Sequence, residues 1–171
     1  MPRVSVIIPT YRRPDFLRRA IGSVLTQTFE DFELLIVDDA SPDNTGQVVK
    51  GIADERIRYC RNEINKGGAA SRNRGIKEAQ SPYIAFLDDD DEWLPQKLAL
   101  QVELLDQSPP KVGGIYTGYE RILRNTGESL GITLPTKRGD LSYELLLSNP
   151  LAGTSGLLLR KECFEKAGLF D

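Results

Sequence analysis

Short apolar runs rich in β-branched residues alternate with helical patterns between residues 4 and 105. The runs cover residues 4–8, 32–37, 56–61 and 83–87, and the helical patterns cover residues 14–25, 45–53, 68–79 and a segment from Pro95 onward. Strands separated by helices of about 10 to 15 residues indicate βαβ crossovers. We therefore predict an α/β fold, with a largely parallel sheet covered by helices on both faces.

The first two segments illustrate the two patterns. Val4 to Ile8 is apolar and β-branched, which favours a strand, and Pro9 is expected to end it. The segment opened by Pro14 and Asp15 carries its apolar residues on one helical face. These residues are Phe16, Leu17, Ala20, Ile21, Val24 and Leu25.

The pattern becomes looser after Ser108-Pro109-Pro110. We predict strands at residues 114–121 and 156–159 and helices at residues 140–147 and 161–167, whereas residues 125–139 are polar and contain glycine. The sequence shows no repeat, low-complexity tract or clear linker. We therefore expect a single domain over residues 1–171.

Composition excludes several classes of function. The chain has 22 Lys and Arg residues against 25 Asp and Glu residues, which argues against a dedicated nucleic-acid binder. It contains no histidine, which rules out Ser-His-Asp and Cys-His catalysis and an HExxH zinc site. Acid and base chemistry is left to carboxylates, Lys, Tyr or Cys.

Other features indicate a soluble cytoplasmic protein. Cys60 and Cys163 lack CxxC spacing, so we expect buried, reduced thiols. The apolar run after Arg3 is too short for a signal peptide or a membrane span. No GxxxxGK[ST] motif is present, which sets aside a P-loop NTPase.

Polar residues follow three of the predicted strands: Pro9-Thr10-Tyr11, Asp38-Asp39 and the acidic run Asp88 to Glu92. Because parallel strands end at the same edge of a sheet, these residues should converge where such folds bind ligands. Five consecutive acids are often a solvated loop. This run, however, lies between apolar residues and Trp93, and clustered, partly buried carboxylates need a counter-charge. Mg²⁺ or Mn²⁺ is the simplest partner.

The other candidates each have two explanations. Asp38 would accept a hydrogen bond from a nucleobase or a ribose hydroxyl, while Asp39 is also a good helix cap. Tyr11 is either a surface residue or a stacking platform for a base. The glycines in residues 66–73 either open a helix or present amides to an anion. Arg72 either lies on the surface or reaches a phosphate.

Four blocks resemble, in order, the signature blocks of family 2 glycosyltransferases: Val4 to Tyr11, Ile36 to Thr45, Ser71 to Gly75 and Phe86 to Pro95. The resemblance covers most of residues 3–105. It implies a GT-A fold, which is a Rossmann-like sheet that binds a nucleotide-diphosphate sugar and transfers the sugar with inversion. Residues 1–108 would form the nucleotide-binding half, and residues 109–171 would begin the acceptor-binding half.

The resemblance also implies roles for individual residues. The nucleobase pocket would be lined by Pro9, Thr10 and Tyr11 with Arg13 nearby, and Asp38, or less readily Asp39, would contact the base. Arg72 would lie beside the nucleotide, and Asp88 and Asp89 would lie near the ribose. Asp90 would bind Mn²⁺ or Mg²⁺ in an Asp-x-Asp motif. The extra acid leaves the register of that motif open by one position. A cation at Asp90 would neutralise the charge that grows on the departing diphosphate.

The same resemblance leaves the general base unassigned. In this family an acidic pair follows a Gly-Leu-Phe-Asp block, which matches Gly168 to Asp171. We therefore expect the catalytic carboxylate beyond Asp171, so that residues 1–171 are a C-terminally truncated and nearly inactive enzyme. Residues 151–156 match the looser acceptor-side region or are an ordinary loop.

The expected partners are a nucleotide-diphosphate sugar, preferably of uridine, and a saccharide or lipid-linked acceptor of cell-envelope polysaccharide synthesis. The full-length protein would associate peripherally with the membrane. Two alternatives stay open: a noncatalytic module that binds nucleotide sugars, and a signalling receiver domain. The receiver is disfavoured because its acidic pair follows the first strand, whereas Asp38-Asp39 follows the second.

Overall fold

The computed structural model describes residues 1–149, 151 and 153–171. Its strands are β1 (Val4–Thr10), β2 (Phe32–Asp38), β3 (Ile57–Arg61), β4 (Tyr83–Phe86), β5 (Gly114–Tyr116), β6 (Tyr119–Ile122), β7 (Ser129–Thr133) and β8 (Leu157–Arg160). Six of them form one sheet in the order β3-β2-β1-β4-β8-β5. The first four in this order are parallel, and β8 runs antiparallel to both of its neighbours. The prediction of a largely parallel sheet is confirmed.

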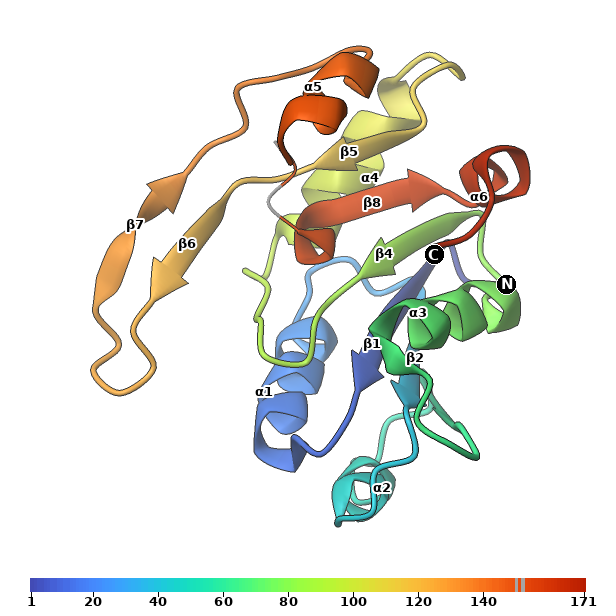
Figure 1. Ribbon diagram of the computed structural model, residues 1–171, viewed down its shortest axis with the longest axis vertical. Coiled ribbons are helices and arrows are strands. Elements are labelled where there is room, and N and C mark those ends of the chain that lie inside the picture. The colour runs from blue at the N-terminus through green and yellow to red at the C-terminus, as the bar shows by residue number, and fades with distance from the viewer. Residues whose placement is uncertain (150, 152) are drawn as a thin grey trace.

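Helices cover both faces of this sheet (Figure 1). They are α1 (Pro14–Leu25), α2 (Thr45–Lys50), α3 (Gly67–Glu78), α4 (Lys97–Gln107), α5 (Ser142–Leu147) and α6 (Glu162–Ala167), with a short 3₁₀ turn η1 (Thr154–Gly156). The apolar faces of α1 and α4 pack with Leu34 and Ile36 of β2 in one core cluster. Ile76 of α3 packs with Leu35 and Val37 on the opposite face. Because neighbouring residues of a strand point to opposite faces, β2 contributes to both clusters and is apolar almost throughout.

The predicted end of the first strand is wrong, and the helix predicted at residues 45–53 ends at Lys50. Pro9 does not end β1, which continues to Thr10. The carbonyl of Ile7 accepts a hydrogen bond from Leu87 on the β4 side, and the carbonyl of Thr10 accepts one from Asp39 on the β2 side. Alternation places the nitrogen of Pro9 on the β4 side, beyond the last paired residue of that strand. The missing N–H therefore removes no sheet hydrogen bond.

The predicted strand at residues 114–121 is two strands in different sheets. β5 joins the main sheet, whereas β6 pairs with β7 in a hairpin that extends away from it (Figure 1). The break falls at Thr117-Gly118, where a Cβ on Gly118 would lie 2.4 Å from the carbonyl oxygen of Thr133. β7 lies in the stretch 125–139 that the sequence marked only as polar.

Two further observations concern the whole described part of the chain. No helix among residues 1–149, 151 and 153–171 is long and apolar enough to cross a membrane. Cys60 and Cys163 are both free thiols, as predicted, although each is only half-buried.

Gly75 allows α3 to pack closely on β1. A Cβ at this position would lie 2.5 Å from Cγ2 of Ile7, which is fully buried. By contrast, a Cβ on Gly22 in α1 would have nothing within 4 Å. The two positions therefore make a matched pair of helical glycines.

We expect Gly75→Ala to destabilise the protein and Gly22→Ala to stabilise it. Overpacking against Ile7 costs about 1 to 3 kcal/mol, which exceeds the gain in helix propensity of up to about 1 kcal/mol. At Gly22 only the gain applies. Urea unfolding measures both, and equal stability of the two variants would show that α3 does not pack as closely on β1 as described.

Candidate functional site

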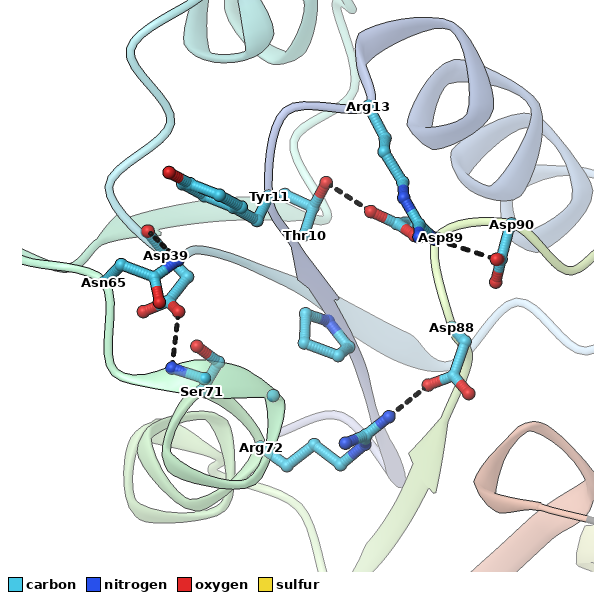
Figure 2. A pocket seen from close by; sticks show the side chains of 13 residues that line it. Thr10, Tyr11, Arg13, Asp39, Asn65, Ser71, Arg72, Asp88, Asp89 and Asp90 are labelled. Carbon is cyan, nitrogen blue, oxygen red and sulfur yellow. Dashed lines mark hydrogen bonds and ion pairs between the residues drawn. The ribbon is translucent and has the colours of Figure 1, made fainter.

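A pocket of about 450 Å³ lies at the carboxyl ends of β1, β2 and β4, beside the start of α3 (Figure 2). It is lined by Pro9, Thr10, Tyr11, Arg13, Asp39, Asn65, Gly67, Gly68, Ser71, Arg72, Asp88, Asp89 and Asp90. The three polar strand ends of the sequence therefore converge, as predicted. Figure 2 shows Tyr11, Asp39 and Asn65 at one end and the three aspartates of the acidic run at the other.

Asp39 connects β2 to the start of α3. Its carboxylate accepts hydrogen bonds from the side-chain amide of Asn62 at 2.7 Å and from the backbone amides of Lys66 at 3.0 Å and Gly67 at 2.7 Å. Burial opposes ionisation of Asp39, but these donors outweigh it and lower the pKa of the carboxyl. Asp39 thus caps α3, the helix after β3, rather than α2, the next helix in the sequence.

Asp38 lies outside this pocket. It accepts hydrogen bonds from the amide of Ser41 at 2.8 Å and from the hydroxyl of Tyr59, and it lines an adjoining hollow of about 280 Å³. Successive side chains of a strand point in opposite directions, so only one of the two aspartates can face the pocket. We expected Asp38 to contact a base ahead of Asp39, and the structure instead places Asp39 in the pocket.

The end of β1 holds two acids of the run. The hydroxyl of Thr10 donates to Asp89 at 2.7 Å, and Nη1 of Arg13 donates to Asp89 at 3.2 Å and to Asp90 at 2.8 Å. Arg13 therefore lies at the acidic end of the pocket, away from Tyr11. Tyr11 is at the rim with its side chain partly exposed.

The acidic run is not a freely solvated loop. Nη2 of Arg72 donates to Asp88 at 2.5 Å, and the hydroxyl of Ser155 donates to Asp91 at 2.6 Å. Burial raises the pKa of Asp89 and of Asp91, although their hydrogen-bond donors oppose the shift. Of the acids in the pocket, Asp90 is the one whose only hydrogen-bond donor among the described residues is a half-exposed arginine.

The donor set fits a divalent cation that a ligand helps to hold. Within the described part of the chain, no three acidic or thiol side chains converge on one point. Carboxylate oxygens are the ligands that Mg²⁺ and Mn²⁺ prefer, and such ions usually complete their coordination with water and phosphate oxygens. Asp90 would then hold the ion together with an anionic ligand in the pocket.

The start of α3 provides the opposite charge. Gly67 and Gly68 begin the helix, and Gly67 has the positive φ of 86° that favours glycine. A Cβ on Gly68 would lie 3.1 Å from Nη1 of Arg72. The Nε atom of Arg72 is buried and lacks a hydrogen-bond partner among the described residues. The guanidinium and the positive end of the helix dipole favour an anion here, although Asp39 already takes the backbone amides of Lys66 and Gly67.

Several site residues were not singled out from the sequence. Asn65 and Ser71 line the pocket, and their position beside the glycines that open α3 was the available signal. Thr154 and Ser155 of η1 bond to Asp88 and Asp91, and no local pattern indicated these contacts. They fall in the expected acceptor-side region 151–156, of which Ala152 lies outside the described residues.

Comparison with known proteins identifies similar chains. The model of the family "Glycosyl transferase family 2" matches residues 5–168. The Escherichia coli UDP-Glc:alpha-D-GlcNAc-diphosphoundecaprenol beta-1,3-glucosyltransferase WfgD is 38% identical over 85% of this chain and 55% of its own length. The Bacillus subtilis putative teichuronic acid biosynthesis glycosyltransferase TuaG is 34% identical over 94% of this chain and 63% of its own length. The chain thus spans a little over half the length of these relatives.

Solved structures share the fold. The mannosyltransferase PcManGT from Pyrobaculum calidifontis, in complex with GDP-Man and Mn²⁺, superposes with a TM-score of 0.74 at 22% identity, over 99% of this chain and 48% of that one. S. aureus TarS in complex with UDP-GlcNAc has a TM-score of 0.68 at 21% identity, over 98% and 48%. The fold is therefore GT-A. A receiver domain, kept open from the sequence, is ruled out by the family match.

Proposed function

Since this chain belongs to glycosyl transferase family 2, we propose that it binds a nucleotide-diphosphate sugar, preferably of uridine, and serves the inverting transfer of that sugar. The acceptor is a saccharide or a lipid-linked saccharide of cell-envelope polysaccharide synthesis, as the names of WfgD and TuaG suggest. The observation that carries the proposal is the pocket itself. One end offers an aromatic ring and hydrogen-bonding groups, and the other combines carboxylates with an anion site.

The nucleobase belongs at the end formed by β1 and β2. Tyr11 at the rim is placed to stack on a base, with Pro9 and Thr10 forming the floor. Asp39 replaces Asp38 as the acid that contacts the base, because Asp38 lies outside the pocket. The carboxylate of Asp39 already accepts three donors, so it presents only its remaining lone pairs to a base N–H.

The ribose and diphosphate belong between α3 and the acidic run. Asp88 and Asp89 are placed to accept from ribose hydroxyls, and Arg72, whose Nε lacks a partner among the described residues, is placed to donate to a phosphate. Asp90 holds Mn²⁺ or Mg²⁺ together with diphosphate oxygens. The ion would stabilise the negative charge of the departing nucleotide diphosphate.

These residues bind and orient the donor so that its anomeric carbon faces the acceptor. A carboxylate general base must take the proton of the acceptor hydroxyl, and we assign that role to none of residues 1–171. The proposal for these residues is therefore donor binding, and the proposal of transfer concerns the whole protein.

Calorimetric titration tests donor binding. We expect UDP to bind in the presence of Mn²⁺ or Mg²⁺ and to bind more weakly when EDTA removes the metal, because the ion would offset the repulsion between the carboxylates and the diphosphate. GDP under the same conditions tests the preference for uracil. Absence of binding of both nucleotides with both metals would contradict the proposal.

Arg13 is expected to compete with the cation. Its Nη1 atom pairs with the carboxylates of Asp89 and Asp90. Arg13→Gln should therefore raise the affinity for Mn²⁺ alone by about 3- to 10-fold, as expected when a unit positive charge a few ångströms from the cation is removed. The control is Arg19→Gln, because Arg19 pairs with Glu92 in the same acidic run but not with these aspartates. Electron paramagnetic resonance of free Mn²⁺ measures the affinity. An equal rise in both variants would assign the effect to net charge, and no rise in Arg13→Gln would refute the competition.

A further inference from the structure

The turn η1 contacts the acidic run from a distant part of the chain. The hydroxyl of Ser155 donates to Asp91 at 2.6 Å and accepts a hydrogen bond from the backbone amide of Asp88 at 3.1 Å. The hydroxyl of Thr154 lies 3.2 Å and 3.4 Å from the two carboxylate oxygens of Asp88 and donates to them. Two consecutive hydroxyls thus hold the first and last of four consecutive aspartates.

The turn is itself anchored. The carbonyl of Ser155 accepts a hydrogen bond from the indole N–H of Trp93 at 2.8 Å, and the carbonyl of Gly156 accepts one from the side chain of Gln101 at 2.9 Å. Trp93 is buried, and the buried ammonium of Lys97 lies 3.5 Å from the centroid of its ring. These contacts connect η1 to α4 and keep its two hydroxyls in place.

The contacts divide the acids between two parts of the molecule. Asp88 and Asp91 are bonded to η1, while Asp89 is bonded to Thr10 and Arg13 at the end of β1. Asp90 is left with Arg13 as its donor. Ser155 donates to the carboxylate of Asp91, which follows Asp90 in the sequence and does not line the pocket.

We propose that Thr154 and Ser155 are positioning residues of the donor site: they hold the acidic run in one conformation and leave Asp90 as the carboxylate that meets the cation. The inference rests on the proposed donor binding and goes beyond it. It gives the second half of the chain a part in holding the metal and diphosphate, although neither hydroxyl has to touch the donor.

The test is calorimetric titration of the folded protein with UDP, in Mn²⁺ and in EDTA. Ser155→Ala should weaken Mn²⁺-dependent binding at least about 10-fold, the size of effect seen when groups that orient metal ligands are removed. Thr154→Val should weaken it less, because Asp88 retains Arg72. In EDTA both variants should match the wild type within about 2-fold, because only the metal-dependent part of binding depends on the acidic run.

Two further variants separate positioning from folding. Thr117→Val removes a hydroxyl that lies 3.5 Å from the carbonyl of Gly156 on the same turn and contacts no acid, so it should bind UDP like the wild type. Ser155→Thr keeps the hydroxyl and should restore most of the Mn²⁺ dependence. Thermal melting of each variant without ligand shows whether it is folded.

The affinity for Mn²⁺ alone, measured by electron paramagnetic resonance, makes the two proposals independently testable. If the wild type binds Mn²⁺ but no nucleotide, donor binding fails, and a loss of Mn²⁺ affinity in Ser155→Ala still supports positioning. If the wild type binds UDP and Ser155→Ala behaves like Thr117→Val, positioning alone is wrong. Absence of both Mn²⁺ and nucleotide binding would overturn both proposals.

Discussion

Asp90→Asn is expected to abolish the effect of Mn²⁺ on UDP binding, which corresponds to a loss of about 10- to 100-fold in affinity in the presence of the metal. Asparagine has nearly the shape of aspartate but lacks its charge, so it is a much weaker ligand for a hard cation. The neighbouring acids do not replace it, because Asp89 is bonded to Thr10 and Asp91 to Ser155. Titration calorimetry with and without EDTA measures the change.

Glu92→Gln is the matched control for Asp90→Asn. Glu92 belongs to the same acidic run and has a similarly exposed side chain, but it pairs with Arg19 outside the pocket. The Glu92→Gln substitution removes the same charge, so we expect the UDP affinity in Mn²⁺ to change by at most about 2- to 3-fold, in keeping with screening between exposed charges. Equal losses in the two variants would mean that the cation senses only the net charge of the run.

Asp39→Asn is expected to destabilise the protein by about 1.5 to 3 kcal/mol at pH 7 and to weaken nucleotide binding. The NH₂ group that replaces one carboxylate oxygen cannot accept from the backbone N–H groups of Lys66 and Gly67, so a part-buried donor loses its charged partner. The start of α3 then loosens, and the phosphate site that it forms loosens with it. Chemical denaturation and UDP titration measure the two effects.

The pH dependence identifies the carboxylate as the cause. The pKa of Asp39 is lower in the folded chain than in the unfolded chain, so its stabilisation is complete above the unfolded value of about 4. It is lost as the pH falls through the folded pKa. The wild type should therefore lose stability below about pH 4 more steeply than Asp39→Asn.

Asp43→Asn provides the comparison for Asp39→Asn. Asp43 accepts from the amide and the hydroxyl of Thr45 through one oxygen, which asparagine keeps, so Asp43→Asn should change the stability by less than about 0.5 kcal/mol. Nucleotide binding should be unaffected, because Asp43 does not line the main pocket. If Asp39→Asn resembled Asp43→Asn in both stability and UDP affinity, the charge and the second carboxylate oxygen of Asp39 would contribute to neither.

The layered α/β fold and the edge at which the site lies follow from local sequence patterns. Apolar runs such as Val4–Ile8 and Phe32–Val37 are too continuous for strands with a solvated face, so they must be buried on both faces between helices. Parallel neighbours then place Thr10, Asp39 and Asp88 at one edge. This inference needs only local periodicity and the direction of the strands, both of which are encoded in short stretches of chain.

Tertiary structure decided which side chains face the pocket. Asp38 and Asp39 are adjacent acids, and the orientation of β2 between β1 and β3 selects Asp39. Pro9 stays within β1 because the pairing with β4 ends before Pro9, so its missing N–H removes no sheet hydrogen bond. Thr154 and Ser155 meet acids more than 60 residues earlier in the chain. Such contacts depend on how elements distant in the sequence pack against each other, and no local pattern of residue types specifies this packing.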